Sequence, residues 1–152
     1  MARCSRRRFL AAAAAGVVAA HVRVAGAQLA AQPLEPLIAK LTGDASVQPG
    51  RVTLEIPRLA DNGHSVPLKV RVESAMTERD YVKTIHILSG RNPRPHIAAF
   101  HLNPHCGRAE ISTRVRLNGT QRLVVLAQAS DGSWWSGSAE VEVTETACLD
   151  AT

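Results

Sequence analysis

The sequence predicts an all-β protein, an immunoglobulin-like antiparallel β-sandwich with a short helix ahead of it. Segments in which apolar and polar residues alternate follow one another from residue 51 to residue 144, and turn-forming residues separate them. No long helical pattern or internal repeat interrupts the series. About seven short strands with regular turn signals are typical of two antiparallel sheets packed face to face. Because only 3% of the residues are aromatic, we expect an aliphatic core.

The first 27 residues are typical of a cleaved export signal. Residues 5–10 read Ser-Arg-Arg-Arg-Phe-Leu, which matches the twin-arginine pattern, and the apolar run over residues 11–20 is too short to span a bilayer. Small residues at 25–27 provide a cleavage site before Gln28. We therefore expect export by the twin-arginine pathway and a periplasmic mature protein with no membrane attachment.

Removing this signal changes the charge of the chain. The whole sequence has 18 Lys and Arg residues against 13 Asp and Glu residues, for a net charge of +5. Residues 1–27 contain five arginines and no acidic residue, so 13 residues of each sign remain. The positive charge of the full chain is thus no reason to expect nucleic-acid binding. Residues 28–152 are enough for one domain with its own core.

Residues 28–50 are predicted to hold the helix and a linker. Leu34, Leu37, Ile38 and Leu41 fall on one helical face, and Gly43 suits the position just past a helix end. We expect this helix to cover an edge or end of a sheet. Binding to a partner is the alternative.

Residues 51–144 are predicted to form the sandwich. Asn118-Gly119 and Asp131-Gly132 predict tight hairpins on either side of the sixth strand, and Asp61-Asn62-Gly63 falls in a connection. Thr77 to Asp80 has the spacing of a helical capping box, which predicts one helical turn. Of the neighbours Trp134 and Trp135, one should be buried and the other exposed or at an interface. The predicted strands are 52–56, 66–72, 82–88, 96–102, 110–117, 121–130 and 133–144.

Residues 145–152 form a C-terminal tail that carries Cys148. Chain ends are usually mobile and solvated, whereas unpaired cysteines are usually buried, so a thiol in this position indicates chemistry. From Val143, five extended residues reach roughly 16 to 18 Å, which is the geometry of a carrier arm. The alternatives are a thiol without a role, an intermolecular disulfide, or a disulfide to Cys106 that acts as a redox latch.

A second group of residues could bind a metal. Imidazoles and a thiolate are ligands for copper or zinc, but there is no Cys-x-x-Cys or His-x-His pattern, and residues 96 and 101 should point to opposite faces of one strand. Ordinary strand or surface histidines are the favoured interpretation, and a periplasmic redox- or metal-responsive module is the alternative. No catalytic motif is present, so we expect neither an enzyme nor a cofactor. The group comprises His86, His96, His101, His105 and Cys106.

Five motifs in the same order and spacing carry a resemblance to a known family. They are Gly50-Arg51-Val52 with Asp61-Asn62-Gly63-His64-Ser65-Val66-Pro67-Leu68, then Asn92-Pro93-Arg94-Pro95, Phe100-His101-Leu102-Asn103-Pro104, Ala109-Glu110-Ile111-Ser112-Thr113-Arg114-Val115-Arg116-Leu117, and Ser130-Asp131-Gly132-Ser133-Trp134-Trp135-Ser136. Together they closely resemble SoxY, the periplasmic carrier subunit of bacterial thiosulfate oxidation. The similarity covers essentially the whole mature chain.

The resemblance implies a non-enzymatic carrier with an immunoglobulin-like fold, paired in a heterodimer with the smaller β-sandwich subunit SoxZ. It implies that Cys148 holds the sulfur intermediate covalently. Separate periplasmic enzymes would load thiosulfate through a haem protein, remove sulfate by hydrolysis, and oxidise the remaining sulfane sulfur.

The tail departs from the usual ending of this family, which is Gly-Gly-Cys-Gly-Gly. Here it reads Thr146-Ala147-Cys148-Leu149-Asp150. Glycine makes an arm narrow and flexible, and threonine and leucine restrict both properties. We therefore expect a slower or more selective arm, or a specialised SoxY paralogue. Glu145 and Asp150 flank the thiol and should raise its pKa.

Overall fold

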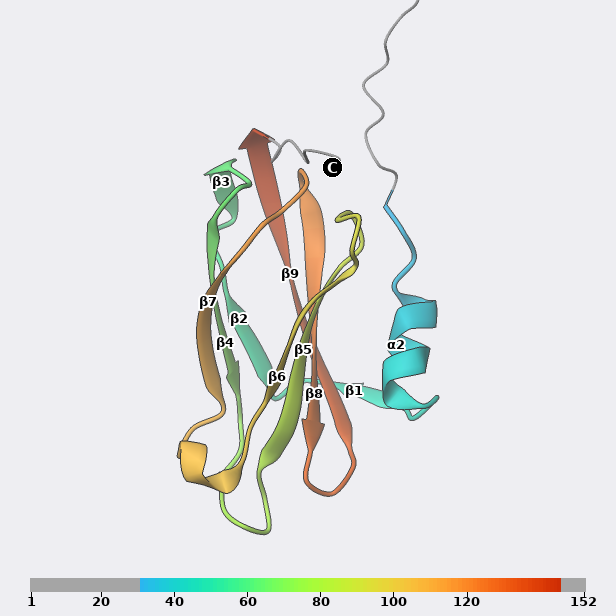
Figure 1. Ribbon diagram of the computed structural model, residues 1–152, viewed down its shortest axis with the longest axis vertical. Helices are drawn as coiled ribbons and strands as arrows, with labels where there is room; N and C mark the ends of the chain where they lie inside the picture. The colour runs from blue at the N-terminus through green and yellow to red at the C-terminus, as the bar shows by residue number, and fades with distance from the viewer. Residues whose placement is uncertain (1–30, 146–152) are drawn as a thin grey trace, which may run out of the picture.

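The computed structural model describes residues 31–145, which form two packed β-sheets and one helix (Figure 1). The larger sheet has six strands in the order β1-β9-β8-β5-β6, with β3 also paired to β9, and the smaller has three in the order β2-β4-β7. The predicted sandwich is thereby confirmed, whereas the predicted signal peptide lies outside the described residues. The elements are α2 (Glu35–Thr42), β1 (Val47–Pro49), β2 (Val52–Glu55), β3 (Leu59–Asn62), β4 (Val66–Val72), β5 (Val82–Ser89), β6 (His96–His101), the 3-10 helix η2 (Pro104–Cys106), β7 (Glu110–Val115), β8 (Gln121–Ala129) and β9 (Trp134–Glu145).

Two strands of the larger sheet were not predicted. The strands β1 and β3 are three and four residues long, and both pair in parallel with β9. Runs this short contain too few alternating positions to stand out as a pattern. Asp61 and Asn62, assigned to a connection above, belong to β3.

The predicted hairpin at Asn118-Gly119 is wrong. The strand before it, β7, pairs only with β4, while β8 pairs with β5 and β9, so the chain crosses here from the smaller sheet to the larger one. Other loops hold the crossing in place: the Leu117 N–H donates to the Gly63 carbonyl at 2.8 Å, and the Asn118 N–H donates to Asn92 Oδ1 at 2.9 Å. The two residues still form a corner, with Gly119 at a φ of 82°.

The other two turn predictions have different outcomes. Asp131-Gly132 does join β8 to β9 as a hairpin, in which the Ala129 N–H donates to the Ser133 carbonyl at 2.9 Å. Hydrogen bonds from the Ser133 hydroxyl and N–H lower the pKa of the Asp131 carboxyl. Thr77 to Asp80 forms no helical turn, although Thr77 Oγ1 accepts the Asp80 N–H at 3.1 Å as a capping residue would.

The core between the sheets is aliphatic, as expected. Along β4, alternate residues point inward and are buried, while their neighbours face solvent. The inward side of β8 meets them from the other sheet. The largest fully buried side chains include Leu68, Ile85, Ile87, Leu117, Leu123 and Val125.

The helix α2 covers an outer face of the larger sheet, not an edge or end of it (Figure 1). Its apolar residues pack against Leu88, Leu126 and Trp134. Trp134 is buried at 5% exposure, whereas Trp135 is only partly buried, and the Arg51 guanidinium lies 4.4 Å from the centre of its ring. The two tryptophans face opposite sides of the sheet as predicted, but neither is exposed, because Trp135 packs against the core between the sheets. Within residues 31–145, no helix is long and apolar enough to cross a membrane.

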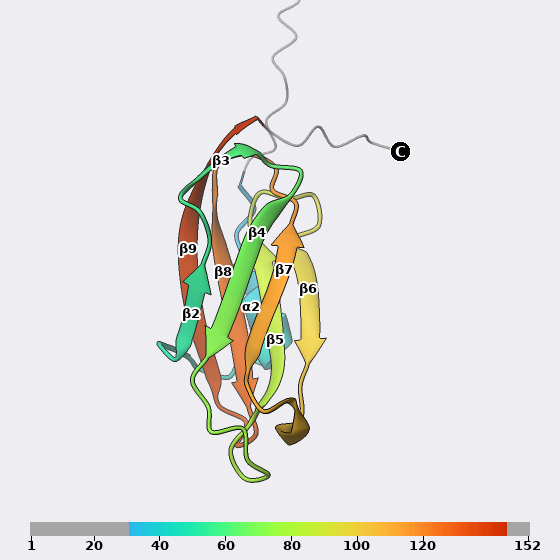
Figure 2. The same cartoon turned by 90° about the vertical axis from the view of Figure 1, so that its left-hand side faces the viewer.

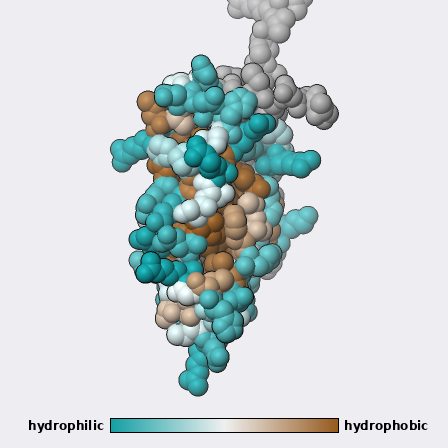
Figure 3. Space-filling view, turned by 60° about the vertical axis from the view of Figure 1, so that its left-hand side comes forward, coloured by the Kyte–Doolittle hydropathy of each residue, from teal (hydrophilic) through white to brown (hydrophobic). Residues whose placement is uncertain are grey.

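The edge strands β6 of the larger sheet and β7 of the smaller sheet lie on the same side of the sandwich (Figure 2). Polar side chains cover much of the face in Figure 3, and apolar side chains form a band between them. Ile97 and Phe100 of β6 are only partly buried, because no strand of the described chain pairs with the outer edge of β6.

Gly137 permits a close approach between the sheets. The strand β2 of the smaller sheet lies against β9 at this point, and a Cβ atom on residue 137 would collide with the Val52 carbonyl and lie 2.9 Å from Leu54 Cδ1. A glycine inside a strand often marks such a close approach.

We therefore predict that Gly137→Ala destabilises the fold by about 1–3 kcal/mol, because the added methyl must push β2 away from β9. Urea unfolding followed by tryptophan fluorescence measures the change. Ser136→Ala in the same strand is the control and should change the free energy of unfolding by less than about 0.5 kcal/mol. Equal stability of the Gly137→Ala and Ser136→Ala variants would show that the two sheets do not meet closely at residue 137.

Candidate functional site

The candidate site begins where β9 ends. Along one edge β9 is paired with β8, from Trp134 opposite Gln128 to Val141 opposite Gln121. Along its other edge, the final residues pair in parallel with β3, with Ala60 opposite Val143 and Asn62 opposite Glu145. The strand is thus held up to Glu145, three residues before Cys148.

Three further hydrogen bonds fix this end of the strand. The Thr144 hydroxyl donates to the Asp61 carbonyl at 2.8 Å, and the Gly63 N–H donates to the Glu145 carbonyl at 3.0 Å. On the other edge, the Val143 N–H donates to Thr120 Oγ1 at 3.0 Å. Our sequence reasoning missed Thr120, whose only local signal is its place directly after Asn118-Gly119.

Cys148 lies outside the described residues, and so does Asp150. The structure therefore locates Glu145, where the tail begins, but not the thiol. The role of Cys148 and the raised pKa of its thiol stay predictions.

Cys106 is the free thiol within residues 31–145. It is exposed in η2, where its Sγ lies 3.7 Å from Asn103 Oδ1. The same Asn103 oxygen accepts the His105 N–H at 3.0 Å, so this short helix is capped locally. It lies at the end of the sandwich opposite the end of β9, as the orange-yellow turn at the bottom of Figure 1 shows.

An intramolecular disulfide between Cys106 and Cys148 does not fit this arrangement. The strand β9 spans 12 residues, which is about 36 Å of extended chain. The three residues from Glu145 to Cys148 reach at most about 11 Å, and a disulfide needs Cα atoms within about 7 Å of each other. The redox latch between these two cysteines is therefore incompatible with the fold.

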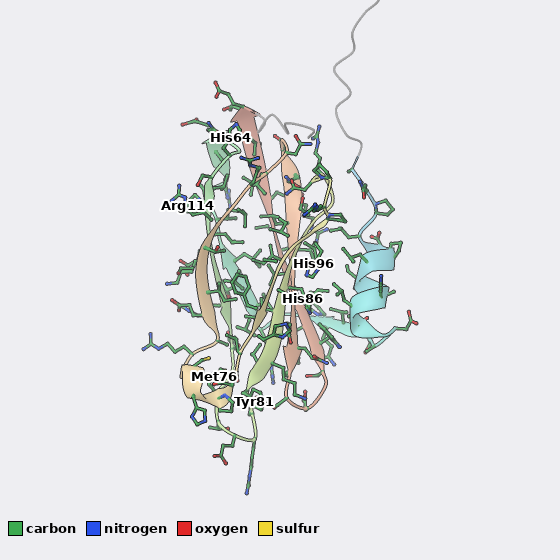
Figure 4. The ribbon with its side chains drawn as sticks, in the orientation of Figure 1. His64, Met76, Tyr81, His86, His96 and Arg114 are labelled. Atoms are coloured by element: carbon green, nitrogen blue, oxygen red, sulfur yellow. The ribbon has the colours of Figure 1, made fainter. Side chains whose placement is uncertain are left out.

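Two of the histidines singled out in the sequence meet on the outer face of the larger sheet (Figure 4). His86 Nδ1 and His96 Nε2 lie 3.2 Å apart, at hydrogen-bond distance. The His86 ring also stacks on Trp134, with ring centres 5.9 Å apart. His101 lies on the same strand as His96, and its Nδ1 is 3.3 Å from the Thr84 hydroxyl.

The prediction that His96 and His101 point to opposite faces is wrong because of a β-bulge. His101 pairs with Thr84 and Ala98 with Ile87, but His96 pairs with Leu88, so the register shifts by one residue. The extra residue in β6 returns His96 to the face that carries His86 and His101. Simple alternation cannot reveal such a shift.

The electrostatics of this face favour a neutral His86. Burial lowers the pKa of His86 below its ordinary value, and the nearby His96 and His101 lower it further because adjacent positive charges repel. No three His, Cys, Asp or Glu side chains within residues 31–145 are grouped closely enough to hold a metal ion. Cys106 and His105 lie apart from the pair, so the five residues of the alternative metal site do not converge.

The fold and the site define a class: an immunoglobulin-like β-sandwich whose last strand leads directly into a segment that carries a cysteine. The model of the family "sulfur oxidation protein SoxY" matches residues 38–148. The chain belongs to the SoxY family, and this membership supports a sulfur-carrier role.

Solved structures agree with this assignment. The sulfur carrier protein SoxY from Chlorobium limicola f thiosulfatophilum is 30% identical, with a TM-score of 0.62 over 72% of this chain and 90% of that chain. Superoxide reductase (neelaredoxin) from Ignicoccus hospitalis is 14% identical, with a TM-score of 0.55 over 62% of this chain and 80% of its own. Superoxide reductase from Nanoarchaeum equitans is 13% identical, with a TM-score of 0.53, over 63% of this chain and 100% of its own. At such identities the likeness to the reductases shows the fold alone. No curated protein matches the chain.

We predict that His86 makes the fold sensitive to mild acid. Its pKa is lower in the folded chain than in the unfolded chain, so the unfolded state binds a proton first as the pH falls. Stability should be full above about pH 6.5 and decline below it. Urea unfolding at a series of pH values should show a shallower decline in His86→Gln than in the parent.

His105→Gln is the control, because it removes an exposed histidine that lies apart from His86 and His96. Its free energy of unfolding should fall with pH as that of the parent does. The readout is the slope against pH, so a constant loss of stability from the substitution does not affect it. A His86→Gln variant with an unchanged slope would show that His86 titrates equally in both states.

Proposed function

We propose that this protein is a non-enzymatic carrier that holds sulfur-oxidation intermediates covalently on Cys148 during thiosulfate or sulfide oxidation. The observation that carries the proposal is the family match, which extends to residue 148. That residue follows a strand that is paired with β8 up to Val141 and with β3 up to Glu145. A thiol on a short segment beyond a rigid strand suits a group that must enter the sites of other proteins.

The membership of the SoxY family implies the steps of the carrier cycle. Loading joins the Cys148 sulfur to the sulfane sulfur of thiosulfate, and this oxidative step releases one proton and passes two electrons to the haem protein that loads it. Water then cleaves the terminal sulfonate as sulfate and leaves a persulfide on the cysteine. Oxidation of that sulfane sulfur to a sulfonate takes its oxygen from water and passes six electrons to a partner redox enzyme. A second hydrolysis then releases sulfate and returns the thiol. Each of these steps belongs to a partner enzyme, and the carrier supplies the attachment point.

A SoxZ-like β-sandwich subunit and the periplasmic sulfur-oxidising enzymes are the partners that this proposal needs. The twin-arginine pattern of residues 5–10 supports periplasmic delivery. After cleavage of residues 1–27, the carrier would work without membrane attachment or nucleic acid.

A second candidate is a specialised SoxY paralogue that serves only some of these enzymes. The observation that favours it is the tail sequence, in which Thr146, Ala147, Leu149 and Asp150 stand where the family usually has glycine. The redox- or metal-responsive module has less support, because its histidines and Cys106 do not converge within the described chain.

We predict that Cys148→Ser abolishes loading. The mature protein with its SoxZ-like subunit, incubated with thiosulfate and the loading enzymes, should gain a mass of added sulfur or thiosulfonate that mild reductant removes. Intact-mass spectrometry before and after reductant checks this result. Cys106→Ser is the matched control and should load like the parent, because Cys106 lies at the far end of the sandwich.

Two outcomes would count against the carrier. One is an added mass that persists in Cys148→Ser and disappears in Cys106→Ser. The other is an unmodified Cys148 in a system that loads a glycine-armed SoxY in parallel, which would favour the redox- or metal-responsive module.

A further inference from the structure

Two histidines that the carrier function does not use meet on the outer face of the larger sheet. His86 belongs to β5 and His96 to β6. His96 pairs with Leu88, two residues along β5 from His86, so the two histidines are diagonal neighbours on one face. His86 Nδ1 and His96 Nε2 lie 3.2 Å apart (Figure 4). The fold therefore brings two imidazole nitrogens together on this surface.

The separation of the two nitrogens fits two ligands of one metal ion. With metal–nitrogen bonds of about 2.0–2.1 Å, two nitrogens of a tetrahedral site lie about 3.3–3.4 Å apart. Neighbouring nitrogens of a square-planar site lie about 2.8–2.9 Å apart for bonds of the same length. The 3.2 Å between His86 Nδ1 and His96 Nε2 falls between these values. Small rotations of the two rings would therefore place a metal ion between the nitrogens.

The sheet holds both histidines in place. The strand β5 is paired along both edges, with β6 and with β8, and the His86 ring stacks on Trp134 at a ring-centre distance of 5.9 Å. The β-bulge in the pairing of β5 with β6 sets the face on which His96 lies. Directly before His96, the Pro95 carbonyl accepts the Ser89 N–H at 2.8 Å. Because the two rings are held before a ligand arrives, binding costs little ordering.

The protonation of the pair also suits a metal ion. Metals bind the neutral form of imidazole. Burial, and then the charges of His96 and His101, lower the pKa of His86, so this ring stays neutral at a pH where an ordinary histidine begins to bind a proton. In the pair without a metal, one of the facing nitrogens donates to the other. Metal binding needs both as acceptors, so the donor ring moves its proton to its other nitrogen by exchange with water.

The donor atoms select the class of metal. Imidazole nitrogens suit copper, nickel and zinc, whereas Mg²⁺ and Ca²⁺ prefer oxygen ligands. Among these divalent ions, Cu²⁺ binds nitrogen sites most tightly. Residues 31–145 bring no third His, Cys, Asp or Glu side chain close enough to complete the coordination. The pair would therefore leave coordination positions open, unlike a structural site with four protein ligands.

We propose that His86 and His96 form an open two-histidine site for a late first-row divalent cation, with Cu²⁺ preferred over Zn²⁺. Water, or a donor atom from a second molecule, completes the coordination. The site uses neither Cys106 nor Cys148, and it differs from the five-residue alternative above, whose members lie apart. It goes beyond the carrier function and does not depend on it.

The first test titrates Cu²⁺ into the mature chain without an added histidine tag, in a Cys106→Ser, Cys148→Ser background that removes competing thiolates. Isothermal titration calorimetry measures the affinity. Quenching of tryptophan fluorescence locates the ion, because His86 stacks on Trp134. His96→Gln should weaken Cu²⁺ binding at least about tenfold, since the second imidazole binds as an intramolecular ligand. The double variant His86→Gln, His96→Gln should bind no more weakly than either single variant, which distinguishes a chelate from two separate ligands.

Two matched controls keep the number of histidines removed at one. His105→Gln removes an exposed histidine at η2, far from the pair, and should keep the affinity of the parent. His101→Gln should also keep it, because His101 Nδ1 lies against the Thr84 hydroxyl at 3.3 Å. Excess Mg²⁺ or Ca²⁺ should not displace Cu²⁺.

The second test measures folding instead of binding. The folded chain holds the two imidazoles together and the unfolded chain does not, so Zn²⁺ should raise the urea midpoint of the parent. His105→Gln should show the same rise, and His96→Gln should show little or none. Circular dichroism of each variant without metal establishes that it is folded.

Three results would overturn the proposal. Equal Cu²⁺ affinity in the parent and in His96→Gln would show that the pair does not chelate. A double variant that binds far more weakly than both single variants would indicate two independent ligands. Loss of binding in His105→Gln or His101→Gln to the extent expected for His96→Gln would place the ion elsewhere. No sulfur donor or partner enzyme is used, so this site and sulfur carriage can each fail while the other holds.

Discussion

The structure depends above all on the pairing of β9 along both of its edges. One edge is hydrogen-bonded to β8, and the other is hydrogen-bonded to β1 at its start and to β3 at its finish. Between these two short strands lies Gly137, where β2 of the smaller sheet packs against β9. Trp134, the first residue of the strand, lies in the cluster covered by α2. A single strand therefore joins the larger sheet, the smaller sheet and the helix, and its last residue is fixed by bonds that any local opening must break.

A rigid end to β9 determines what the tail can do. With two residues between Glu145 and Cys148, the thiol reaches about 11 Å from the sandwich at most. For the carrier proposed above, a partner enzyme must therefore bring its reacting groups close to this end of the sandwich. The surface around β3, Thr120 and the end of β9 would then be part of the docking surface. A longer or looser attachment would widen the volume that the thiol samples and lower its effective concentration at the partner.

Much of the fold could be predicted because burial alternates along the long strands, as in β4, where every second residue faces the core. What could not be predicted depends on contacts distant in sequence. Asn118-Gly119 satisfies the local rule for a hairpin, but β7 pairs with β4 some 40 residues earlier, which no local pattern specifies. The contact between His86 and His96 depends on one extra residue in β6, which reverses the face that simple alternation predicts. Cys148 was predicted as the attachment residue from its residue type, its position and the family resemblance. The described residues locate only the strand that precedes it.

A carrier thiol must enter the sites of its partners, and for the carrier proposed above the fixed end of β9 sets how far the thiol can reach. Leu149 and Asp150 make the arm wider than the glycines that usually stand on either side of the cysteine. Wider and less flexible residues restrict the channels that the arm can enter. On this reasoning the unusual tail narrows the range of partners: only an enzyme whose channel accepts these side chains can reach the thiol.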